Sequence, residues 1–135
     1  MPTLYDDLNQ MGCSQQLSHL DVAETLRLAA KAANVSHKGF TSGQLPEGLV
    51  LDMSPLLRVN HVWNPAASLL DASGLEVGLA LQTTWSSKCV SVTWRLPDTR
   101  TGNCVVYFDA EDFDSKLRAK NLAVTRAAAA IGSQM

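Results

Sequence analysis

Between Leu75 and Asp109, apolar and polar residues alternate along three consecutive runs of the chain. The runs cover residues 75–84, 89–96 and 104–108. Successive side chains of a β-strand point to opposite faces, so a period of two residues predicts three strands. Because one side of each run is apolar, the pattern predicts an antiparallel sheet with one buried face and one polar face.

Helices are expected on both sides of these strands. Residues 18–34 carry apolar side chains at helical spacing, with Ser18 in a capping position and Asn34 at the end. The segment 110–131 begins with acidic residues and continues with basic ones. That order favours a helix because it complements the helix macrodipole. A further short helix is expected to begin at Asn64, which is followed by a proline.

We therefore expect a single α+β domain in which an antiparallel sheet of three to five strands is packed by N-terminal and C-terminal helices. A chain of 135 residues has the usual size of one domain and buries about two-thirds of the surface that its unfolded form exposes. The expected organisation is a helical part at 1–34, a loop at 35–48, mostly strands at 49–109 with a short helix at 64–72, and a C-terminal helix at 110–131.

Composition limits the partners and the location of the protein. The net charge of −2 argues against nucleic acid as a general partner. Three cysteines, without C-x-x-C spacing, argue against a disulfide framework and favour a reducing compartment. No apolar stretch approaches the roughly 20 residues that cross a bilayer. We therefore expect a cytoplasmic protein that does not contact a membrane.

No residue pattern identifies a reaction centre. His19, His37 and His61 do not share metal-ligand spacing with each other or with the cysteines. Glycine-rich phosphate loops of the G-x-G-x-x-G and G-x-x-x-x-G-K types are absent from the sequence. We therefore assign no catalytic residue, metal or cofactor. A small thiol-dependent enzyme remains an alternative, because Cys89 is expected on the polar side of its strand, where a histidine could activate it.

A second alternative is a nucleic-acid-binding regulator. The segment from Leu28 to Ser36 resembles the first helix and turn of helix-turn-helix DNA-binding proteins. A recognition helix would then occupy residues 37–45, where each of two glycines costs about 1 kcal/mol relative to alanine. Binding by this degenerate motif at 20–45 would require Lys31 and Lys38 to approach the nucleic acid.

Two surfaces are candidates for contact with a partner. One is the loop at 35–48, because loops of this length inside compact domains are often functional. The other is the polar face of the sheet, although antiparallel sheets commonly leave such a face merely solvated. The candidate binding residues are Lys38, Phe40, Thr41 and Gln44 in the loop, and Gln82, Ser91, Thr93 and Arg95 on the sheet.

From Asn60 onward, the order of features resembles small phage-encoded proteins of the ABA-sandwich type. The matching stretches are Asn64–Ala67, Val90–Trp94 and Leu122–Ile131. This resemblance covers the C-terminal half only, implies a phage or prophage accessory protein of undefined activity, and carries over no catalytic residue. We expect a non-enzymatic accessory or regulatory protein that binds another protein and could form a homodimer. A secretion chaperone is a further alternative, since such chaperones are also small, acidic and α+β.

Overall fold

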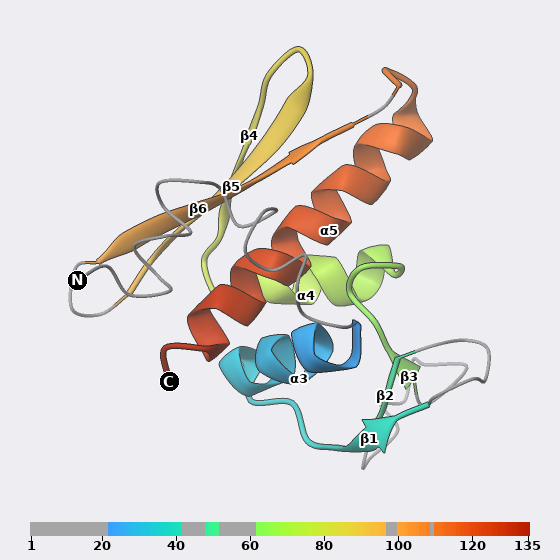
Figure 1. Cartoon of the computed structure of the whole chain (residues 1–135), viewed down its shortest axis with the longest axis vertical. Helices are drawn as coiled ribbons and strands as arrows, with labels where there is room; N and C mark the ends of the chain where they lie inside the picture. The colour runs from blue at the N-terminus through green and yellow to red at the C-terminus, as the bar shows by residue number, and fades with distance from the viewer. Residues whose placement is uncertain (1–21, 42–47, 52–61, 97–99, 109) are drawn as a thin grey trace.

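The computed structural model describes residues 22–41, 48–51, 62–96, 100–108 and 110–135. These residues form two three-stranded antiparallel sheets, β1-β2-β3 and β4-β5-β6, together with helices α3, α4 and α5. Figure 1 shows the two sheets on opposite sides of the helices. The predicted α+β fold is confirmed, with the strands divided between two sheets.

The second sheet is formed by the region of the sequence in which apolar and polar residues alternate. It consists of β4 (Gln82–Trp85), β5 (Cys89–Arg95) and β6 (Thr101–Tyr107), paired in the order of the chain. Val90, Val92 and Trp94 are buried on one face of β5, as their spacing predicts. Cys104 and Val106 continue this buried face on β6, where they lie opposite Val92 and Val90.

Helix α5 (Phe113–Gly132) covers the buried face of this sheet and contacts β5 and β6. Asp112 caps its N-terminus by accepting a hydrogen bond from the backbone N–H of Ser115 at 2.7 Å. The predicted C-terminal helix is thus confirmed, starting three residues later than expected. On its other side, α5 packs against α3 (Val22–Ala33) and α4 (Leu69–Gly78), so that it lies at the centre of the domain (Figure 1).

Small residues allow α3 and α5 to approach closely. Ala29 and Ala30 of α3 are buried, and so are all residues from Ala127 to Gly132 of α5. A Cβ atom added at Gly132 would lie 1.9 Å from the carbonyl oxygen of Leu28, so the crossing has no room for a side chain there. The Ala-rich end of α5 is therefore a helix-packing surface.

Helix α3 ends at Ala33, directly before Asn34, where the sequence predicts the end of the helix. Asn34 follows the helix with a φ of 57°, in the left-handed region that asparagine tolerates better than most residues. The backbone N–H of Val35 then donates to the carbonyl of Ala30 at 2.9 Å. The predicted stop at Asn34 is confirmed, whereas residues 1–21 of the predicted helical part lie outside the described residues.

Helix α4 corrects two predictions. Its N-cap is Ser68, whose hydroxyl accepts from the N–H of Asp71 at 3.3 Å, and the helix continues to Gly78 instead of ending near residue 72. The alternation that begins at Leu75 therefore starts inside a helix. Leu75 is buried against the core, whereas Val77 is 83% exposed. Of the strand predicted at 75–84, the part that forms is in β4. Residues 75–78 belong to α4, where apolar residues two apart do not indicate a strand.

The first sheet contains β1 (His37–Phe40), β2 (Leu49–Leu51) and β3 (Val62–Trp63). Strand β1 lies in the segment predicted as a loop, and β2 pairs with it. Gly39 has a φ of 126° next to an irregularity in this pairing, a conformation that the sequence pattern does not reveal. Residues 37–40 form a strand, so they do not form the recognition helix that the helix-turn-helix alternative requires.

Candidate functional site

The strand register brings polar side chains together on the face of sheet β4-β5-β6 that points away from α5. Thr93 lies between Gln82 of β4 and Asn103 of β6, in one row across the three strands. Ser91 lies in the next row, opposite Thr84 and Val105, and Arg95 lies opposite Thr101 at the end of the sheet. We call this surface the outer face. The four sheet residues predicted as binding residues, Gln82, Ser91, Thr93 and Arg95, all lie on it.

A pocket of about 360 Å³ opens at the Arg95 end of the outer face. It has a volume within the range of roughly 300–1,000 Å³ that is typical of ligand sites. Three of the predicted residues share it, whereas Ser91 does not. The described residues that line the pocket are Ala80, Gln82, Thr93, Trp94, Arg95 and Thr101.

The side chains around the pocket suit an anionic or strongly polar group. Gln82 supplies a carboxamide, Thr93 and Thr101 carry hydroxyls, and Arg95 supplies a planar guanidinium with five N–H donors. The Arg95 side chain forms no ion pair or hydrogen bond with another described residue, and Arg95 is exposed. A guanidinium without a partner can bind a carboxylate through two parallel hydrogen bonds.

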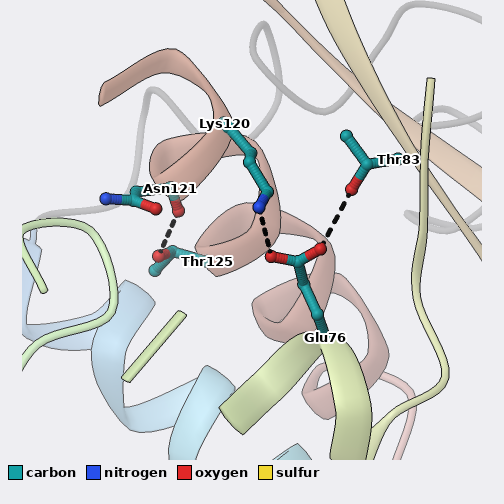
Figure 2. A network of polar contacts seen from close by, with 5 residues as sticks. All are labelled: Glu76, Thr83, Lys120, Asn121 and Thr125. Carbon is teal, nitrogen blue, oxygen red and sulfur yellow. Dashed lines mark hydrogen bonds and ion pairs between the residues drawn. The ribbon is translucent and has the colours of Figure 1, made fainter. Parts of the chain in front are cut away.

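The strand that leads into the pocket is anchored from its other face. The hydroxyl of Thr83 donates to Oε2 of Glu76 in α4 at 3.3 Å, and Oε1 of Glu76 lies 2.9 Å from Nζ of Lys120 in α5. Figure 2 shows these three side chains meeting where α4, α5 and β4 come together. The contacts fix the position of β4, and with it the neighbouring Gln82.

The predicted loop residues belong to a different part of the molecule. Lys38 is exposed on β1, and Phe40 packs against the hydrophobic core. Thr41 holds the β1–β2 connection together: its hydroxyl accepts from the N–H of Gly48 at 3.2 Å. Gln44 lies outside the described residues. The loop and the outer face therefore do not form one site, since the helices separate their sheets (Figure 1).

Three of the lining residues, Ala80, Trp94 and Thr101, are not among the predicted binding residues. Thr101 precedes the predicted run at 104–108, but β6 begins at Thr101 and pairs it with Arg95. Extending the alternation of residues 104–108 backwards would have placed Thr101 on the same side as Val105. Ala80 lines the pocket from a turn, where its φ is 53°. An alanine in the sequence does not predict a positive φ.

The structure places no described histidine near Cys89, so it does not support the alternative of a thiol-dependent enzyme. Cys89 is a partly exposed free thiol, and its Sγ lies 2.9 Å from the hydroxyl of Ser86. Among the described residues the one histidine is His37, which belongs to the other sheet. Cys104, in contrast, is disulfide-bonded and is therefore not a free thiol.

Across the described segments, no group of histidine, cysteine and acidic residues could hold a metal ion. Nor is any helix in these segments both long enough and apolar enough to cross a membrane. No protein-family model matches the chain, and no significant similarity to a curated protein or to a solved structure is found.

Proposed function

We propose that this chain is a non-enzymatic binding protein that engages another protein through its outer face. The observation that carries the proposal is the side chain of Arg95, which lines the pocket and has no partner among the described residues. The partner would supply an acidic side chain or a terminal carboxylate to this pocket. The hydroxyls and the carboxamide around Arg95 would then orient the carboxylate.

The chemistry of the lining favours binding over catalysis. Gln82, Thr93, Arg95 and Thr101 include no carboxylate, imidazole or thiol, the groups that most often act as general base or nucleophile. Exposed polar residues continue from the pocket along β4, where Gln82 and Thr84 face the solvent. A surface that extends beyond the pocket suits a protein partner, which contacts rows of residues and not one cavity alone.

Four finer expectations stay predictions: the origin, the role, the oligomeric state and the location. A phage or mobile-element origin rests on the sequence resemblance of the C-terminal half. A regulatory or accessory role and homodimerisation are compatible with a small binding domain. A cytoplasmic location is an expectation from composition, and the disulfide at Cys104 does not support it, because disulfides are rare in reducing compartments.

Site-specific photocrosslinking in the cells that produce the protein tests the proposal. A benzoylphenylalanine placed at Gln82 should give a discrete protein adduct, because this position lines the pocket. The same group at Arg27, an exposed residue of α3, serves as the matched control and should not give that adduct. The substitution Arg95→Glu, combined with the crosslinker at Gln82, should abolish it. An adduct that is insensitive to Arg95 would contradict the proposal.

A further inference from the structure

Strand β6 forms one edge of its sheet, and the hydrogen bonds at its two ends show which backbone groups point outward. The N–H of Phe108 donates to the backbone carbonyl of Lys88, and the N–H of Leu96 donates to the backbone carbonyl of Arg100. In an antiparallel pair, residues that exchange hydrogen bonds alternate with residues that do not. With the observed register, the even-numbered residues of β6 bond to β5. The odd-numbered residues, from Thr101 to Tyr107, direct their backbone groups away from the sheet.

Along most of the strand, these outward groups have no hydrogen-bond partner in the part of the chain that the structure describes. Asn103, Val105 and Tyr107 each direct an N–H and a carbonyl to the edge, and the structure gives these groups no hydrogen-bond partner among the described residues. Proteins usually protect such edges with charges, prolines, bulges or a covering segment. A regular seven-residue edge strand is a template on which another strand can pair.

A groove of about 170 Å³ runs beside the Tyr107 end of this edge, between β6 and α5. Apolar residues of both elements line it, and Tyr107 at its border is 70% exposed. Arg118 is the charged side chain among the described lining residues, and it is exposed. The described residues lining the groove are Val106, Tyr107, Phe108, Ser115, Arg118, Ala119 and Leu122.

We propose that the β6 edge and this groove form a second interaction site, which binds an extended acidic peptide segment as a fourth strand. The outward groups of Asn103, Val105 and Tyr107 would pair with its backbone. Residues of the added strand at positions i and i+2 point to the same face. An apolar side chain would therefore enter the groove while an acidic one, two residues away, faces Arg118. Peptides recognised by strand addition gain affinity from the backbone and specificity from such alternate side chains.

Charge complementarity favours this occupant over a second copy of the chain. If β6 of another copy paired with this edge, it would direct Gly102, Cys104 and Val106 towards the groove. None of these is acidic, so a second copy would bring no carboxylate to Arg118 from this strand. The site is also independent of the proposed function, because the described residues lining the groove do not include Arg95.

The test uses the synthetic peptide acetyl-Thr-Val-Thr-Glu-Thr-Val-Thr-amide and the whole chain. On binding, the amides of Asn103, Val105 and Tyr107 should exchange hydrogen about tenfold more slowly, because they become hydrogen-bonded. Two control peptides carry N-methyl groups, one on the Thr amides and the other on the Val and Glu amides. The peptide methylated on the Thr amides should lose binding and the other should keep it. Residues that bond to Asn103, Val105 and Tyr107 carry their side chains on the outer face, and in the proposed pose these are the Thr residues. If the peptide methylated on the Thr amides binds like the parent, if the other control loses binding, or if the parent does not bind, the proposal is wrong.

Protein variants separate this site from the other possibilities. Val105→Pro removes an outward N–H without removing a bond to β5, and it should abolish binding, whereas Val105→Thr should retain it. Arg118→Glu should weaken binding, and replacing the peptide's Glu by Lys should restore it. Arg95→Glu should leave peptide binding unchanged, so failure here and failure of the proposed function can be told apart. Protection of the three amides in the free protein that depends on its concentration would show a second copy instead, and would overturn the proposal.

Discussion

The carboxylate of Glu76 lies 2.9 Å from the ammonium group of Lys120, and this ion pair joins α4 to the central helix α5. Both side chains are largely shielded, with exposed fractions of 20% and 22%. The second oxygen of Glu76 accepts from Thr83 of β4 (Figure 2). One carboxylate thus connects three elements, which is why we regard it as the anchor of the strand beside the candidate pocket.

Removing this ion pair should cost measurable stability. We expect Lys120→Met to lower the free energy of unfolding by about 1–2 kcal/mol, between the values typical of exposed and buried pairs. The matched control is Arg27→Met, because Arg27 and Glu24 are 3.7 Å apart and half exposed. That change should stay within about 0.5 kcal/mol. Urea denaturation of both variants checks the difference, and equal losses would contradict the role of Lys120.

Two glycine substitutions should have opposite effects, because Gly132 lies at the close crossing of α3 and α5 whereas Gly74 has open space around it. Gly132→Ala places a Cβ against the Leu28 carbonyl and should lower stability by about 1–3 kcal/mol, because the helices must separate. Gly74→Ala, inside α4, meets nothing within 4 Å and should raise stability by about 0.5–1 kcal/mol. Thermal unfolding monitored by circular dichroism measures both. A stabilised Gly132→Ala variant would show that the crossing is looser than described.

The cap of α5 predicts a pH dependence. Hydrogen bonds from the side chain and the backbone N–H of Ser115, with help from Arg118, hold the pKa of Asp112 below its ordinary value of 3.8. A carboxyl group with a depressed pKa contributes stability above its unfolded pKa and loses it as the pH falls through the folded pKa. Asp112→Asn should therefore flatten the fall in melting temperature on acidification below about pH 4. NMR titration of Asp112 would disagree with this account if its pKa were above 3.8.

Asn121 offers a stabilising substitution. Its side chain is 4% exposed in the middle of α5, and its Oδ1 atom has no hydrogen-bond partner. Burying an unsatisfied carbonyl costs about 1–3 kcal/mol, and asparagine is a poorer helix former than alanine. Asn121→Ala should therefore raise the free energy of unfolding by about 1 kcal/mol. A loss of stability in chemical denaturation would show that the amide makes a contact that the protein needs.

Periodicity predicted the strands where one face is buried throughout. Val90, Val92 and Trp94 all face α5, so the buried side of β5 is visible in the sequence. The same rule failed at Val77, because apolar residues two apart also occur in helices and the short helix was expected to end at residue 72. Strand β1 was missed for a different reason: its register irregularity at Gly39 interrupts the period of two.

The candidate site could be predicted only in part. Once the strands pair in sequence order, Gln82, Thr93 and Arg95 must share a face, and the structure places them together. The pocket itself depends on the turn at Ala80 and on the start of β6 at Thr101, which are set by backbone conformation and register. Sequence patterns carry little information on either. The unpaired edge of β6 was likewise invisible, since it follows from which alternate residues bond to β5.

The central claim is that a protein partner binds through Arg95 on the outer face, and quantitative affinity purification tests it most directly. The wild-type chain and the Arg95→Glu variant would be recovered from the native cells, and the co-purifying proteins compared by mass spectrometry. Arg95 is exposed, so the substitution should change stability by no more than about 0.5 kcal/mol. We predict a discrete partner whose recovery falls at least about tenfold in the variant, as expected for the loss of an interfacial charge pair. Recovery of the same proteins in equal amounts by both chains would contradict the claim.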